Sequence, residues 1–159
     1  MFKIDQNVTI DVFHVGSEYP LLMERITGKN LVVNAGLNII RNVLAQPDSA
    51  IRQSFLRVYF HWGSGTTAPG ATQTALITPG AGDPQVITEA NDGTNYQITY
   101  KYYMPSGTAN GEDLKEAGLF FGNTAGDNEL FSRVLIDPFI AKTVDKAITF
   151  TWVHTITAS

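Results

Sequence analysis

Apolar and polar residues alternate along most of this chain. The pattern is clearest in residues 146–157, where one face carries Ile148, Phe150, Trp152, His154 and Ile156 and the other carries Thr149, Thr151, Val153, Thr155 and Thr157. A period of two predicts a β-strand with one buried face. Weaker versions of the pattern predict seven more strands, at residues 8–15, 21–26, 55–62, 85–89, 96–104, 115–121 and 129–136.

One segment follows the helical period instead and predicts a short α-helix over about residues 34–45. Asn34 is a favourable N-cap, and Pro47 stops the helix because proline lacks the amide that the next turn needs. The apolar stripe consists of Gly36, Leu37, Ile40, Val43 and Leu44. A helix this short is not stable alone in water, so we expect the stripe to dock on the strands.

Turn signals separate the predicted strands. Asn91-Asp92-Gly93-Thr94 is a strong hairpin turn, residues 122–128 form a second polar turn, and Asp137-Pro138 is expected to end the strand before it. The fold class predicted is therefore mainly β. We expect residues 1–159 to form one domain, an antiparallel β-sandwich of about eight strands with one short helix.

Composition narrows the possible partners. The net charge is −4 and the basic residues are scattered singly, which argues against a nucleic-acid partner. The absence of cysteine excludes disulfides and thiolate metal sites. No apolar run is long enough to span a membrane, and the N-terminal residues lack the apolar core of a signal peptide, so we expect no membrane insertion.

Only 16% of the residues are charged, whereas about 25% is typical of a soluble domain. A surface of low charge is compatible with burial under partner chains. It is equally compatible with an ordinary all-β domain that exposes Thr and Asn.

The glycine-rich stretch after the third predicted strand, at residues 55–62, raises the question of phosphate binding. It reads GSGTTAPG over residues 63–70 and contains no lysine, and the flanking segments do not form the βαβ unit of a dinucleotide site. Ser64 also lacks the context of a nucleophile elbow. We therefore expect a structural turn and no bound cofactor.

The titratable residues do not form a recognisable catalytic or metal-binding set. His14, His61 and His154 are far apart in sequence; His154 is expected in the core with a hydrogen bond, and His61 is expected to be exposed. The acidic groups at Glu112, Asp113 and Glu116 and at Asp127 and Glu129 do not match a calcium loop, so solvated loop charges are expected. The sequence predicts neither a catalytic residue nor a metal ligand.

Tyrosines recur along the strand predicted at residues 96–104. Tyr96, Tyr100 and Tyr102 are expected on one face and Tyr103 on the other. We rank a core role first, a subunit interface second and a sugar-stacking platform third.

Two short motifs resemble a known class of protein. The first is a strand that runs into Gly63, Gly65, Thr66, Thr67 and Pro69; the second is an E-x-G-L-F strand at Glu116, Gly118, Leu119 and Phe120. Together with the segment NLVVNAGLNIIRNVLA at residues 30–45 and the strand ELFSRVLI at residues 129–136, they resemble small structural proteins of tailed bacteriophages. The similar proteins are tail-fibre attachment and baseplate-associated proteins.

This resemblance implies a virion structural protein assembled in the host cytoplasm, with no enzymatic activity and no cofactor. It implies a homo-oligomer, as a trimer or ring, in contact with other virion proteins. The lack of a repetitive shaft favours a tail-tip, baseplate or fibre-attachment connector over a complete fibre. The alternatives are a capsid decoration protein on the phage head and a glycan-binding receptor-recognition module that uses the tyrosines.

Overall fold

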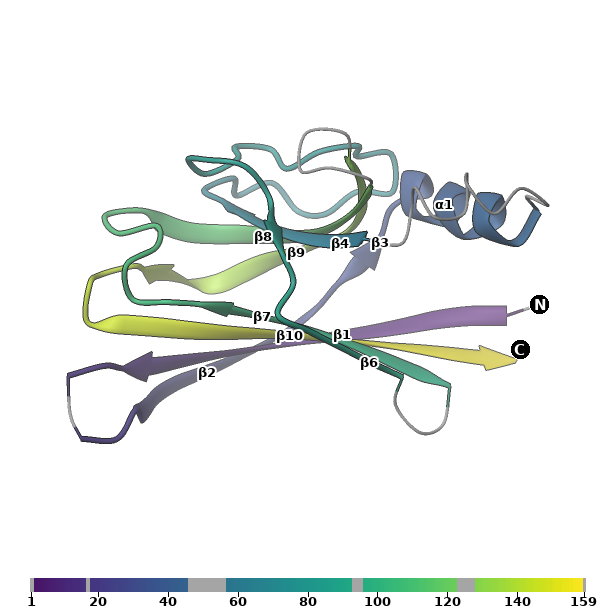
Figure 1. The fold of residues 1–159 in the computed structure, drawn as a ribbon. Helices are drawn as coiled ribbons and strands as arrows, with labels where there is room; N and C mark the ends of the chain where they lie inside the picture. The colour runs from purple at the N-terminus through teal and green to yellow at the C-terminus, as the bar shows by residue number, and fades with distance from the viewer. Residues whose placement is uncertain (1, 17, 46–56, 93–95, 123–127, 159) are drawn as a thin grey trace.

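The computed structural model describes residues 2–16, 18–45, 57–92, 96–122 and 128–158. Two antiparallel sheets of five strands each pack face to face, with one helix at one end (Figure 1). The predicted mainly β fold with one helix and a sandwich architecture is therefore confirmed. The residues predicted as turns at 93–94 and 123–127, and the start of the predicted strand at 55–56, lie outside the described residues.

The first sheet has the strand order β2-β1-β10-β7-β6. Its strands are β1 (Phe2–His14), β2 (Leu21–Lys29), β6 (Glu89–Asp92), β7 (Gln97–Met104) and β10 (Lys146–Ala158). β1 and β10 pair along their whole length, from Phe2 opposite Ala158 to His14 opposite Lys146. β6 pairs with β7 as the predicted hairpin requires, but Asn91 and Asp92, which were expected in its turn, are strand residues of β6.

The second sheet has the order β3-β9-β8-β4-β5. Its strands are β3 (Leu31–Val32), β4 (Arg57–Gly63), β5 (Gln85–Val86), β8 (Asp113–Gly122) and β9 (Asn128–Ala141). β9 does not end at Asp137-Pro138 as predicted. A bulge absorbs the proline, because Glu116 of β8 pairs with Leu135 and Leu114 pairs with Ile140, which leaves extra residues on β9.

The core lies between the two sheets and follows the predicted alternation. Val8, Ile10 and Val12 of β1 and Ile148, Phe150 and Trp152 of β10 are buried there. The Phe60 ring of β4 stacks on the Tyr102 ring of β7, with 4.2 Å between centroids, and so joins the two sheets.

The outer face of β4 is buried as well. Tyr59 packs with Leu76 of the loop over residues 64–84, and His61 is only 4% exposed. The expectation that His61 is exposed is therefore wrong. The alternation along β4 correctly placed His61 on the face turned away from the sandwich core. The loop over residues 64–84 covers that face, which would otherwise meet water.

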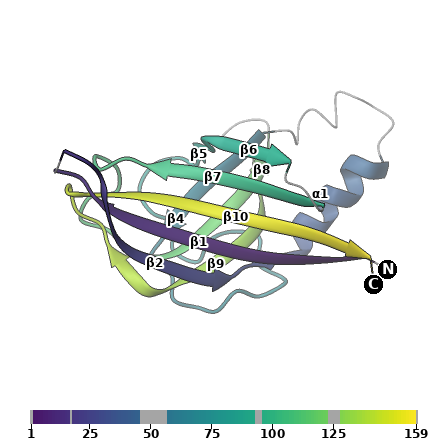
Figure 2. The same cartoon turned by 90° about the horizontal axis from the view of Figure 1, so that it is seen from below.

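Helix α1 (Asn34–Ala45) has the predicted bounds, and its buried face agrees in part with the predicted stripe, since Gly36 is buried and Ile40 packs against the core. Gly36 and Ile39 are the buried residues, whereas Leu37 and Leu44 are 47% and 77% exposed. A Cβ on Gly36 would lie 2.3 Å from the Phe131 carbonyl oxygen, so the first turn contacts β9 closely. Figures 1 and 2 show the rest of the helix extending beyond the end of the second sheet, which leaves part of the apolar stripe uncovered.

Candidate functional site

The glycine-rich loop between β4 and β5 is fastened to β8 by one carboxylate. Glu116 Oε1 accepts hydrogen bonds from the amides of Gly65 at 3.1 Å and Thr78 at 2.8 Å. Its other oxygen accepts one from the Ile77 amide at 3.1 Å. Glu116 thus binds the start of the loop and its residues 77–78 to the outer face of the second sheet.

Arg133 of β9 completes this arrangement from the neighbouring strand. Its Nε donates to Glu116 Oε2 at 2.6 Å, and both side chains are fully buried. The two terminal nitrogens donate to the Thr67 carbonyl at 2.7 Å and to Gln73 Oε1 at 3.1 Å. We call Glu116, Arg133 and the loop groups that they bind the loop clamp.

The loop clamp keeps Glu116 ionised. Burial alone raises the pKa of Glu116, but hydrogen bonds from the Thr78 and Ile77 amides and from Arg133 outweigh it and hold the pKa below its ordinary value. The expectation that Glu116 is a solvated loop charge is therefore wrong. A single Glu and a single Arg, each inside an apolar strand segment, were the sequence signals that could have revealed the pair.

The loop clamp explains why glycine stands at positions 63 and 65, and packing of the loop on the sheet explains Gly118. A Cβ on Gly65 would lie 2.4 Å from Glu116 Oε1, and one on Gly63 would lie 2.3 Å from the Thr78 carbonyl oxygen. A Cβ on Gly118 would lie 2.9 Å from a Leu130 methyl group and 3.1 Å from one of Leu76. The two sequence motifs are therefore two halves of one contact between the loop and the sheet.

The other motif residues also have structural positions. Leu119 is in the sandwich core, and Phe120 packs with Tyr59 and Leu76 under the loop. Thr66 and Thr67 are exposed and Pro69 is half-buried. Three loop amides of the kind that would cradle a phosphate are already bound to Glu116, which favours the structural interpretation of the loop.

A second buried cation, which sequence reasoning missed, organises the turn before β8. Lys142 is 1% exposed, and its Nζ donates to the Ser106 carbonyl at 2.9 Å, to Asn110 Oδ1 at 3.1 Å and to the Thr143 carbonyl at 3.1 Å. Burial lowers the pKa of Lys142. In the same region Glu112 accepts a hydrogen bond from Trp62 Nε1 at 2.8 Å.

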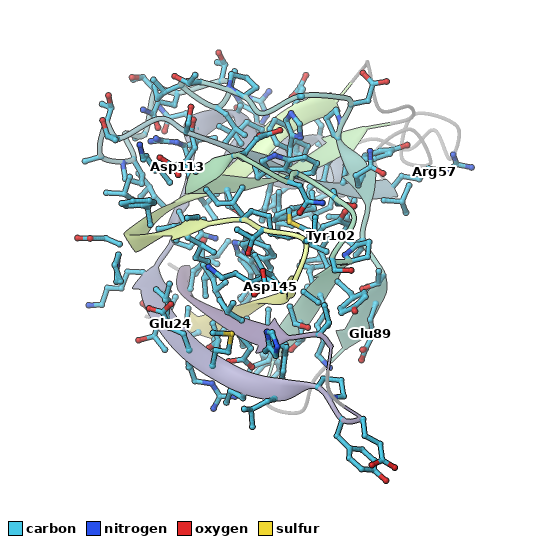
Figure 3. The ribbon with its side chains drawn as sticks, turned by 90° about the vertical axis from the view of Figure 1, so that its left-hand side faces the viewer. Glu24, Arg57, Glu89, Tyr102, Asp113 and Asp145 are labelled. Carbon is cyan, nitrogen blue, oxygen red and sulfur yellow. The ribbon has the colours of Figure 1, made fainter. Side chains whose placement is uncertain are left out.

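The four candidate tyrosines do not share one surface. Tyr102 lies within the body of the molecule, against Phe60 (Figure 3). Tyr96 and Tyr103 are 84% and 47% exposed, and at ~3.3 Å per residue they lie about 20 Å apart along the strand. Tyr100 is half-buried, and burial raises its pKa to about 12.

Tyr100 lines an apolar cavity of about 420 Å³ between α1 and the end of the first sheet. We call this cavity the socket. Helix α1 forms one wall, and the rings of Tyr100, Phe121, Phe131 and His154 meet one another on the opposite side, with centroids 4.7–6.1 Å apart. The remaining lining residues are Ile4, Ile39, Ile40, Val43, Leu44, Ile98 and Ile156.

His154 is the one imidazole in that lining, and the Tyr100 hydroxyl is the other polar group. His154 is buried in the core as predicted, but neither ring nitrogen has a hydrogen-bond partner within the described residues, so the expected hydrogen bond is absent. Burial lowers its pKa to about 4, so the imidazole is neutral at pH 7. The socket therefore presents an uncharged, apolar lining.

Within the described part of the chain, no group of three or more His, Cys, Asp or Glu side chains is arranged to hold a metal ion. The helix found there is too short to cross a membrane. Comparison of the chain with protein-family models, curated proteins and solved structures found no match.

Proposed function

We propose that this protein is a structural component of a bacteriophage virion and acts through protein–protein assembly at the tail tip, the baseplate or a fibre attachment. The observation that carries the assembly role is the apolar surface left uncovered at both ends of the molecule. Leu21, Leu22 and Met23 of β2 are exposed at one end, and the socket with Leu44 is at the other. Exposed apolar patches of this kind mark interaction sites.

The buried charges support a structural role over a catalytic one. Glu116, Arg133 and Lys142 are each fully or almost fully buried, and each makes its hydrogen bonds to the chain itself. Catalytic groups need access to a substrate. These three residues instead fix the loops at 64–84 and 105–112.

The proposed location in the virion rests on the resemblance of the two motifs to phage tail proteins. Their residues act together in the loop clamp, so the motifs describe one structural unit. The separation of the tyrosines does not favour the alternative of a sugar-stacking platform.

Immunogold electron microscopy tests this location. Antibody raised against the purified chain is labelled with gold and applied to phage particles from its host. Gold at the tail ends supports the proposal. Gold spread evenly over the heads would instead indicate a decoration protein, and unlabelled particles would contradict a place in the virion.

A further inference from the structure

Three neighbouring apolar residues project at the tip of the β1–β2 hairpin. Leu21, Leu22 and Met23 are 65%, 45% and 55% exposed, and we call them the knob. A run of three exposed apolar residues is unexpected in a folded chain unless it serves a function. Because β2 is an edge strand, the tip is open to another molecule.

The knob and the socket lie at opposite ends of the molecule. Figures 1 and 2 both show the β1–β2 hairpin projecting at the end opposite α1, and Figure 3 looks onto the hairpin end. One chain therefore cannot place its own knob in its own socket. Only a second copy can bring the two surfaces together.

The two surfaces match in size and polarity. An apolar cavity of about 150 Å³ is enough to hold a benzene molecule. The socket, at about 420 Å³, thus has room for two side chains of the size of leucine or methionine. Its lining residues carry no charge at pH 7, so apolar side chains enter without leaving an ion unpaired.

The charged residues of the hairpin tip and of α1 differ in sign. Glu18 and Glu24 flank the knob, and the basic residue next to them, Arg25, is paired with Asp11. Helix α1 carries Arg41, which is exposed but is not a lining residue of the socket, and no acidic residue. This complementarity favours contact between hairpin and helix over contact of either surface with its own copy.

We infer that copies of this chain assemble head to tail, with the knob of one copy seated in the socket of the next. Such a contact joins two different surfaces, so it either closes into a ring or continues as a filament. The inference deepens the proposed assembly role and rests on it. It adds the contact surfaces and the polarity of the assembly.

Complementary variants test the contact. One variant carries Met23→Lys in the knob, and the other carries Leu44→Lys with Ile156→Lys at the socket; these residues are 40–77% exposed, so the free chain tolerates the changes. We expect each variant alone to dissociate with a constant raised at least about tenfold. The matched control is Val86→Lys, at an apolar β5 residue that is 58% exposed, and it should assemble as the wild type does.

Mixing the two variants is the decisive measurement. The knob variant keeps an intact socket and the socket variant keeps an intact knob, so sedimentation velocity should show a one-to-one complex that cannot grow further. Two variants that stay monomeric when mixed, or that each still assemble alone, would overturn the inference.

Cysteine cross-linking gives a second readout, because the chain contains no cysteine. Under mild oxidation, a mixture of Met23→Cys and Leu44→Cys chains should form mixed disulfide dimers, whereas Met23→Cys with Val86→Cys should not. If the wild type assembles but these pairs fail to link, the contact is wrong and the assembly role stands. If the wild type is monomeric even at millimolar concentration, self-association itself is wrong, whatever the antibody labelling shows.

Discussion

Gly65 leaves no room for a side chain beside Glu116, since an added Cβ would lie 2.4 Å from the carboxylate and 2.7 Å from the Ile77 Cβ. We expect Gly65→Ala to lower the free energy of unfolding by about 2 kcal/mol, because loop or carboxylate must shift. Urea denaturation measures this. Gly107→Ala is the matched control: its Cβ would meet nothing within 4 Å, so a comparable loss there would contradict the steric explanation.

His154 makes stability depend on pH. Its pKa is about 4 in the folded chain and about 6.5 when unfolded, so between these values the unfolded state binds more protons. The free energy of unfolding should therefore fall by about 3 kcal/mol as the pH decreases from 6.5 to 4. His154→Phe should remove this part of the decrease, as urea denaturation at several pH values would show.

His14→Gln serves as the control for that series, because His14 lies in the half-exposed pair with Asp145, far from the socket lining. It should leave the decrease in place. Equal pH profiles for the wild type and His154→Phe would mean that the buried imidazole does not govern the transition.

The loop over residues 64–84 is held chiefly through Glu116, so we expect its attachment to depend on that charge. Glu116→Gln leaves Arg133 buried without its counter-ion, and breaking a buried pair in this way costs about 3–5 kcal/mol. Hydrogen exchange should also become faster at the Gly65, Ile77 and Thr78 amides. Asp11→Asn, which breaks the exposed pair with Arg25, should scarcely move the urea midpoint.

Strand and helix positions were readable from the sequence because they depend on local signals. Asn34 and Pro47 fix the bounds of α1, and alternation fixes the inward face of β10. The sequence did not predict that a loop covers the outer face of β4. The loop is held there by hydrogen bonds from its amides to Glu116, which lies 38 to 51 residues away in the sequence. Leu44 is exposed because the second sheet ends before it reaches that part of the helix. The pattern of apolar residues does not reveal where a sheet ends.

Assembly through apolar surfaces at the two ends of the molecule has a thermodynamic signature. Burial of apolar area weakens on cooling and is little affected by screening of charges. We expect the dissociation constant of the wild-type assembly to rise in the cold and to change little between low and high salt. Sedimentation equilibrium measures both. An assembly that falls apart in high salt would point to ionic contacts instead.

The continuous β1–β10 ladder also determines how the molecule bears force. Phe2 and Ala158 pair at the end where both termini lie, so a pull that separates the termini breaks the ladder one pair at a time, like a zipper (Figure 1). A pull from the hairpin tip to the helix end instead runs along β2, which leads through β3 directly into α1, so the covalent backbone carries the tension. In a head-to-tail assembly tension follows the second path, so each subunit would resist stretching along its strongest mechanical axis.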